Sequence, residues 1–318
     1  MKTQALGPTD LHVSRLCYGA MRISGSWDQA RVDAAAIERG IQMLETAVEA
    51  GYTFIDHADI YGDTTCEMIH GRALDRHPDW RDKLVVATKC GIRFENEPKG
   101  APHRYDLSRK HILDSVEASL RRLKLDRIDL YQFHRPDFLL DPLEAAQAMA
   151  ELHQAGKVRH FGVSNFKPSQ VGALQSALPF PLISNQVEIH LLRLDPFEDG
   201  TLDQCLEKSM TPLAWSPVAA GRLGPAMDAA AAPPPENESK AAIVMRLRPL
   251  LAAIAKEYGV TPLAILLAWL MRHPAKIIPI YGSTRPEAIK EASKADTITL
   301  DRDNWYRILR VARGRGLE

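Results

Sequence analysis

An excess of charge of either sign is missing from this chain. Its 318 residues hold 40 lysines and arginines against 40 aspartates and glutamates, so the formal net charge is zero. That balance gives no electrostatic footprint for a nucleic acid or an anionic membrane as a partner. The N-terminal stretch MKTQALGPTD has no apolar core of the kind a secretory signal needs. The longest apolar run, 262–271, is shorter than the roughly 20 residues that span a bilayer. We therefore expect a soluble cytoplasmic protein.

Paired cysteines and glycine-rich phosphate loops are also missing. The four cysteines, Cys17, Cys66, Cys90 and Cys205, are scattered and form no C-x-x-C pair, so we expect reduced, half-buried side chains. No activating arrangement favours Cys90 as a catalytic thiol. The sequence contains neither the G-x-G-x-x-G fingerprint of a doubly wound nucleotide-binding sheet nor a P-loop.

What the chain does have is a regular alternation of short apolar runs and amphipathic stretches. Strand-like runs begin near residues 16, 53, 84, 127, 158, 183, 211 and 276, with helical patterns between them. Ser108, Asp141-Pro142 and Thr261-Pro262 are typical helix starts. Eight strand–helix units in one chain favour a single-domain (β/α)₈ barrel over residues 1–318. A hairpin over 3–14, a long mobile loop over 219–240 and an extra helix over 301–310 complete the prediction.

Four polar residues follow three consecutive strand-like runs of this pattern. Asp56 and Tyr61 follow one run, Lys89 ends the next, and His134 follows the third. In a parallel barrel the carboxyl ends of the strands share one face, so these residues can converge. Alone, each has an ordinary structural explanation, such as a loop cap, a packing phenol or a satisfied core histidine. Together they form a set that can deliver a proton to a carbonyl oxygen.

The remaining strand ends carry amides, hydroxyls and an aromatic plane. Asn165 and Gln186 are suited to holding a carboxamide while Trp215 stacks on a ring. The segment 282–285 precedes a helix and offers two hydroxyls and the guanidinium of Arg285, which is a phosphate site. We expect Met21, Trp27, the 90–106 loop and the 219–240 loop to build the substrate pocket.

Seven motifs in order resemble the aldo-keto reductase family along nearly the whole chain. They are FIDHADIYG (54–62), VVATKCG (85–91), DLYQFHRPD (129–137), HFGVSNF (160–166), NQVEIH (185–190), AWSPVAAGRL (214–223) and IPIYGSTRPEAIKEA (278–292). The resemblance implies a (β/α)₈ barrel that binds NAD(P)H without a Rossmann domain and reduces aldehydes or ketones to alcohols. It implies Tyr61 as the general acid, with Asp56, Lys89 and His134 completing a tetrad. We expect the Lys89 ammonium to lower the pKa of the Tyr61 phenol, because an adjacent cation favours the phenolate.

The resemblance also implies a set of residues that contact the cofactor. These are Gly19, Met21, Asp56, Ser164, Asn165, Gln186, Trp215, Ser216, Pro217, Gly221, Arg222, Leu223, Gly282, Ser283, Thr284, Arg285 and Glu291. Ala288 stands where many relatives have an arginine, so Arg285 is the cation that we expect to read a 2′-phosphate. NADPH is therefore the predicted cofactor, with NADH as the alternative, and a small carbonyl compound is the predicted substrate.

Two other functions have to be weighed against a reductase. His57, Asp59, His134 and His190 could be ligands of a metal-dependent barrel hydrolase, although a hydrolase has no use for the 282–285 phosphate segment. A cofactor-sensing regulatory barrel without turnover would share the fold, and the complete tetrad argues against it. The sequence gives neither the substrate nor the oligomeric state.

Overall fold

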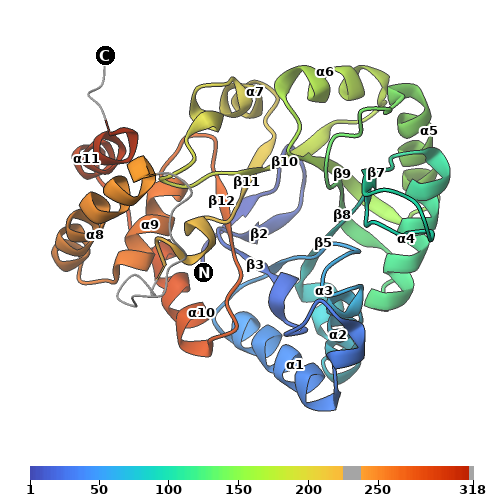
Figure 1. Cartoon of the computed structure of the whole chain (residues 1–318), viewed down its shortest axis with the longest axis horizontal. Coiled ribbons are helices and arrows are strands. Elements are labelled where there is room, and N and C mark those ends of the chain that lie inside the picture. The colour runs from blue at the N-terminus through green and yellow to red at the C-terminus, as the bar shows by residue number, and fades with distance from the viewer. Residues whose placement is uncertain (225–237, 315–318) are drawn as a thin grey trace.

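Eight parallel strands close into a barrel in the computed structural model, which describes residues 1–224 and 238–314 (Figure 1). Around the barrel the order is β10, β11, β12, β3, β4, β5, β8 and β9. The bounds are β3 Cys17–Gly19, β4 Phe54–Asp56, β5 Val85–Cys90, β8 Ile128–Phe133, β9 Val158–Ser164, β10 Leu182–Glu188, β11 Thr211–Trp215 and β12 Ile278–Tyr281. The predicted barrel and its eight strand positions are confirmed.

Helices surround the barrel on its outer side. They are α1 Ala34–Glu49, α2 Thr65–Arg76, α3 Trp80–Lys83, α4 Arg109–Leu123, α5 Pro142–Gln154, α6 Pro168–Ala177, α7 Thr201–Glu207, α8 Glu238–Tyr258, α9 Pro262–Met271, α10 Pro286–Ser293 and α11 Arg302–Arg313. The side chains of Ser108, Asp141 and Thr261 accept bonds from backbone N–H groups in the first turns of α4, α5 and α9. The predicted helix starts are therefore the observed ones, and α11 is the predicted extra helix.

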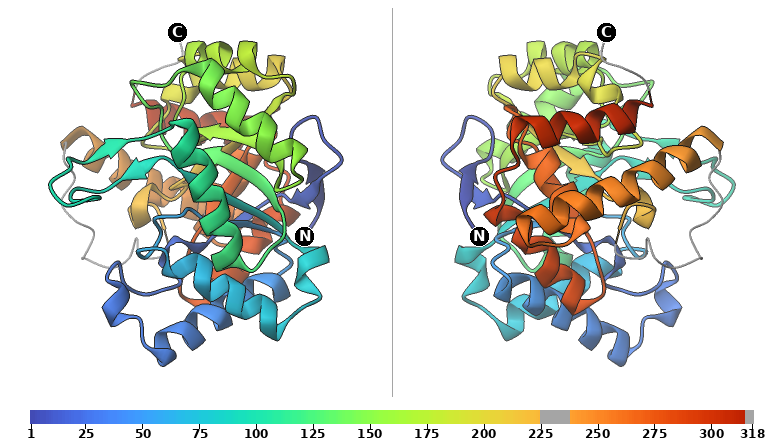
Figure 2. Two further views of the ribbon diagram at one scale, coloured as in Figure 1. Left: turned by 90° about the vertical axis from the view of Figure 1, so that its right-hand side faces the viewer. Right: turned by 90° about the vertical axis from the view of Figure 1, so that its left-hand side faces the viewer.

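The amino-terminal hairpin closes one end of the barrel. Strands β1 Thr3–Ala5 and β2 His12–Ser14 pair antiparallel, as the turn sequence predicted. Leu6, Leu11 and Val13 are buried in one cluster with barrel residues such as Phe54 and Leu130. A second hairpin, β6 Ile92–Arg93 with β7 Arg104–Tyr105, lies at the opposite end (Figure 2). The barrel thus has a sealed floor and a rim, and the strand carboxyl ends face the rim.

The structure corrects the interpretation of 219–240 as one loop. Ala219–Gly221 is a short 3-10 helix, and α8 already begins at Glu238. Residues 225–237, where most of that predicted loop falls, lie outside the described residues. Within the described ranges no single helix is long and apolar enough to cross a membrane, and α8 with α9 meets that test only as a pair bent by 88°.

Candidate active site

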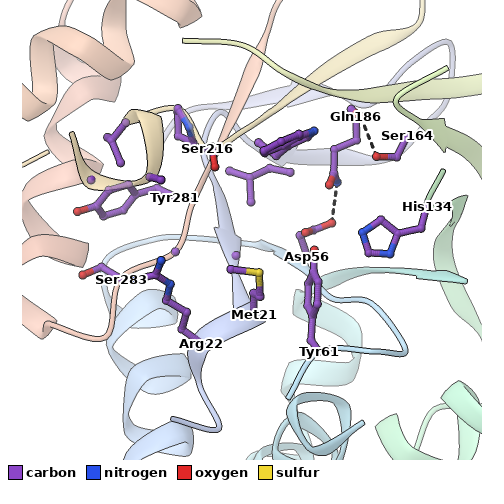
Figure 3. A pocket seen from close by; sticks show the side chains of 18 of the residues that line it. Met21, Arg22, Asp56, Tyr61, His134, Ser164, Gln186, Ser216, Tyr281 and Ser283 are labelled. Carbon is purple, nitrogen blue, oxygen red and sulfur yellow. Dashed lines mark hydrogen bonds between the residues drawn. The ribbon is translucent and has the colours of Figure 1, made fainter. Parts of the chain in front are cut away.

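A cavity of about 550 Å³ opens at the carboxyl ends of the strands (Figure 3). This size is ordinary for a small-molecule site, where about 300–1,000 Å³ is usual. Twenty-six residues line it: Gly19, Met21, Arg22, Trp27, Asp56, Ile60, Tyr61, Ile92, His134, Arg135, Ser164, Asn165, Gln186, Trp215, Ser216, Pro217, Val218, Ala220, Gly221, Gly224, Ile280, Tyr281, Gly282, Ser283, Thr284 and Arg285. All the strand ends that carry predicted site residues therefore converge on one space.

Lys89 is the centre of the buried part of the site. Its Nζ atom donates to Asp56 Oδ2 at 2.8 Å, to the backbone oxygen of His57 at 2.6 Å and to the Tyr61 hydroxyl oxygen at 3.2 Å. The lysine is fully buried and Asp56 is 2 % exposed. An ammonium has three protons to donate, and here each has an acceptor. The Tyr61 oxygen accepts one of these bonds, so its own O–H is left to donate into the cavity.

The turn after β4 places Tyr61 beside His134. Gly62 follows the tyrosine with φ +57°, and a Cβ there would come within 2.3 Å of Ser24 Oγ, so only glycine fits this turn. The rings of Tyr61 and His134 meet edge to face, with centroids 5.9 Å apart. The Trp27 ring also meets the phenol edge to face, with centroids 6.4 Å apart. The predicted tetrad is therefore assembled around one phenol.

Burial dominates the ionisation of the tetrad. It raises the pKa of Tyr61 above its ordinary value, and the Lys89 ammonium opposes that rise without cancelling it. The expected lowering of the phenol pKa is therefore not met. Burial works to lower the pKa of Lys89, but Asp56 and Tyr61 outweigh it and the pKa is raised. Burial holds the pKa of His134 well below its usual range, and the positive charges of Lys89 and Arg135 lower it further. The lysine is charged and the imidazole neutral.

The amides near the tetrad are linked in a network of hydrogen bonds. Gln186 Nε2 donates to Asp56 Oδ1 at 2.8 Å, and Ser164 Oγ donates to the Gln186 backbone oxygen at 2.8 Å. Asn165 Nδ2 donates to Ser164 Oγ at 2.8 Å, and Trp215 Nε1 donates to Asn165 Oδ1 at 3.0 Å. Asn165 and Ser216 have φ of +62° and +51°, a left-handed conformation that is uncommon outside glycine and concentrates at functional sites.

A second group of polar residues lies at the exposed side of the cavity. Gly282, Ser283, Thr284 and Arg285 connect β12 to α10, and the Arg285 backbone N–H donates to Ser283 Oγ at 3.2 Å. A Cβ on Gly282 would lie 2.6 Å from the Gly19 backbone oxygen, so a glycine is needed where β12 passes β3. Arg285 is exposed and precedes the helix, as the phosphate-site prediction requires.

Most predicted site residues line this cavity, and a few do not. Lys89 lies behind the lining, in contact with Asp56 and Tyr61. Arg222, Leu223 and Glu291 are outside the lining; Leu223 is 1 % exposed and Glu291 pairs with Lys294 at 2.7 Å. Their contact with a cofactor stays a prediction.

Sequence reasoning missed several residues of the lining. Arg22 lies on the same side of the cavity as Ser283 (Figure 3), and Arg135 lies over the Trp215 ring, 5.6 Å from its centroid. Arg135 stands inside the HRPD motif directly after His134, which is a signal that could have identified it. Arg22 follows strand β3 by three residues and carries no comparable signal.

The four residues of the hydrolase alternative do not converge. His57 Nε2 lies 2.7 Å from His70 Nδ1 in a buried pair behind the barrel wall, and His190 pairs with Glu188 at 3.1 Å. Among the described residues there is no group of three or more histidine, cysteine, aspartate or glutamate side chains placed to hold a metal. Burial raises the pKa of Asp59, the fourth residue of that alternative, to about 8, with the Glu67 carboxylate adding to the rise.

Comparison with known proteins agrees with this geometry. The Aldo/keto reductase family profile matches residues 15–313. The uncharacterized oxidoreductase YcsN of Bacillus subtilis is 40% identical over 96% of both chains. A 6-dehydroglucose reductase of Agrobacterium fabrum is 39% identical, also over 96% of both. A crystal structure of a thermostable aldo-keto reductase with the inhibitor epalrestat superposes with a TM-score of 0.81 at 28% identity, covering 98% of this chain and 100% of that one. This chain is a member of the aldo/keto reductase family.

Proposed function

We propose that the protein is an NADPH-dependent reductase that converts an aldehyde or ketone to an alcohol, with Tyr61 as the general acid. The observation that carries the proposal is the geometry of Lys89. Its ammonium is buried and satisfied, and one of its three bonds goes to the Tyr61 oxygen at 3.2 Å. A buried cation beside a phenol is expensive to maintain and is useful where the phenol must release a proton.

The residues present fit a nicotinamide cofactor. The half-buried ring of Trp215 lines the cavity and offers a stacking plane, and it is hydrogen-bonded to Asn165, which lines the cavity together with Gln186. Ser283, Thr284 and Arg285 offer hydroxyls and a guanidinium at the opposite side, before α10. The amides would hold the carboxamide, and the 283–285 segment would hold phosphate. When bound, the reduced cofactor would supply a hydride to the carbonyl carbon.

The chain itself supplies the proton and the orientation. Tyr61 gives its phenolic proton to the carbonyl oxygen as that oxygen gains negative charge. Lys89 stabilises the resulting phenolate, since an adjacent cation favours the charged form. Asp56 holds the lysine in position through the 2.8 Å ion pair. The neutral imidazole of His134 donates a hydrogen bond that orients the substrate oxygen.

Cofactor choice follows from the exposed segment. A 2′-phosphate can use two hydroxyls, a helix N-terminus and a guanidinium, whereas a 2′-hydroxyl can use few of them. Arg22 adds a second cation on that side of the cavity. We therefore propose NADPH as the preferred cofactor over NADH.

Turnover of carbonyl compounds tests the proposal. Purified protein is mixed with NADPH and a panel of aldehydes and ketones, and the loss of NADPH absorbance is followed. Because a relative at 39% identity is named 6-dehydroglucose reductase, sugar aldehydes belong in the panel beside simple aromatic aldehydes. Binding of NADPH without turnover of any carbonyl would favour the cofactor-sensing regulatory barrel instead.

A further inference from the structure

Gln186 contacts the tetrad through Asp56 and is also one of the residues predicted to hold the cofactor carboxamide. It lies on β10, is 2 % exposed, and its side chain reaches Asp56 across the barrel. Its Nε2 atom donates to Asp56 Oδ1 at 2.8 Å and lies 3.4 Å from Gln132 Oε1. A carboxylate can only accept hydrogen bonds, so the NH₂ group is the end of the amide that faces Asp56. The oxygen of the amide is then the end left to accept a bond from a cofactor carboxamide.

The Asp56 carboxylate is held from two sides. One oxygen accepts from Lys89 at 2.8 Å and the other accepts from Gln186 at 2.8 Å. Without the second bond, the carboxylate is free to rotate and to present both oxygens to the ammonium. Any shift of Lys89 toward Asp56 lengthens its contact with the Tyr61 oxygen, which at 3.2 Å is already the longest of its three.

We propose that Gln186 is a positioning residue for proton transfer as well as a cofactor ligand. Its amide N–H holds Asp56, which fixes Lys89 and thereby the ability of Tyr61 to give up its proton. The amide oxygen binds the carboxamide, so occupancy of the nicotinamide subsite and readiness of the proton donor depend on one side chain. This inference rests on the proposed function and assigns Gln186 a second role within it.

Several other charged or titratable groups lie around Tyr61 and Asp56. Lys89 faces Tyr61 from β5, His134 faces it from the loop directly after β8, and Cys66 lies near it on α2. Cys17 lies on β3. Burial is the main cause that raises the pKa of its thiol, and the nearby Asp56 carboxylate raises it further. A substitution at Gln186 changes none of these groups, so its effect on Tyr61 must pass through Asp56.

The experiment follows the Tyr61 titration in the cofactor-free protein. Tyrosine is labelled at Cζ with ¹³C, and the Tyr61 resonance is assigned by its loss in Tyr61→Phe. Gln186→Leu removes the amide and keeps the volume. We expect the Tyr61 pKa to rise by about 0.5–1 pH unit relative to wild type, because the phenolate loses part of its contact with the cation. An unchanged Tyr61 titration midpoint in a folded Gln186→Leu protein overturns the proposal.

Two further variants make the test specific. Asn165→Gly removes a predicted carboxamide ligand that does not touch Asp56, and glycine accepts the left-handed backbone there. It should weaken NADPH binding and leave the Tyr61 titration where it is. An equal shift in Asn165→Gly would overturn the proposal. Gln186→Met keeps the length of the side chain without an N–H donor or a new charge, and it replaces Gln186→Leu if that variant does not fold. It should raise the Tyr61 pKa by a similar amount, and no rise would again overturn the proposal.

The outcomes for this inference and for the proposed function are separate. Wild-type turnover in Tyr61→Phe would remove the proposed function, since the phenol would not be the acid. An unchanged Tyr61 pKa in the Gln186 variants, with turnover still dependent on Tyr61, would contradict only the coupling of Gln186 to Tyr61.

Discussion

The two ends of the cavity are built by opposite means. At the tetrad end, Asp56, Lys89 and Gln186 are almost fully buried, and their polar groups bond one another across β4, β5 and β10. At the phosphate end, Thr284 and Arg285 are exposed on a connection between β12 and α10. A buried network in a low dielectric is expensive to disturb, whereas an exposed charge is screened by water and salt. Under the proposed function, the chemistry takes place in the buried network, and cofactor choice depends on exposed residues that can be changed with little effect on folding.

Lys89→Met should have the largest effect. The substitution removes the cation beside Tyr61 and leaves the buried Asp56 carboxylate without its ion-pair partner. We expect the rate of reduction to fall about 10³-fold, within the usual range for acid–base catalysis. In the pH profile of the residual activity, the apparent pKa assigned to Tyr61 should rise, because the phenol loses the cation that opposes its raised pKa.

A surface lysine serves as the control for that variant. Lys83 pairs with Asp79 on the exposed surface, and Lys83→Met should leave rate and pH profile unchanged. A folded Lys89→Met protein with a wild-type pH profile would contradict the coupling of Lys89 to Tyr61.

Tyr61→Phe should come next. The hydroxyl is lost and the ring keeps its contacts with Trp27 and His134. We expect kcat to fall by about 10²-fold or more while the Kd for NADPH, measured by fluorescence quenching, stays near wild type. Tyr306→Phe changes a tyrosine on α11, outside the cavity, and should keep full activity. Reduction at the wild-type rate by Tyr61→Phe would show that the proton comes from elsewhere.

Arg285→Ala probes the exposed end. We expect NADPH binding to weaken about 10- to 100-fold, the scale of one hydrogen bond to a charged group, with little change for NADH. The difference should shrink as salt concentration rises, because the side chain is exposed. Lys290→Ala removes a cation from α10, the helix that follows Arg285, at a position outside the cavity. It should leave both dissociation constants unchanged. Equal losses for both cofactors would mean that Arg285 does not read the 2′-phosphate.

Asp59→Asn should have the smallest effect on turnover, and its consequence appears in stability instead. The pKa of Asp59 is raised from about 4 in the unfolded chain to about 8 in the folded protein, so folding takes up a proton between these values. Wild type should therefore lose stability as pH rises from about 4 to about 8, by up to about 1.4 kcal/mol per pH unit. The variant should lose that slope, so the difference in Tm between variant and wild type should grow with pH. A constant difference would contradict the raised pKa.

The buried end was predictable from sequence and the exposed end only partly. Strand periodicity places Asp56 and Lys89 at strand ends, and parallel strands bring those ends together, so local pattern decides the tetrad. The structure around Leu223 depends on Ala219 and Ala220, which both have positive φ. Alanine gives no sign of that conformation, so sequence alone could not show that Leu223 turns inward.

The ionisation of Tyr61 was also beyond the sequence. Sequence reasoning correctly paired the phenol with the Lys89 ammonium and inferred a lowered pKa. Burial of the phenol has the larger effect and the pKa is raised. The extent of burial depends on Trp27 and other side chains from distant segments, and that packing is a property of the fold.

The sealed floor has a kinetic consequence. Because the amino-terminal hairpin fills the far end of the barrel with Leu6, Leu11 and Val13, cofactor and substrate must enter and leave through one mouth. A cofactor that spans from Trp215 to Arg285 occupies much of that mouth, so the second molecule has to approach over the first. Under the proposed function, this arrangement favours an ordered sequence in which the reduced cofactor arrives first and the oxidised cofactor departs last. Product-inhibition patterns would then be competitive only between the two forms of the cofactor.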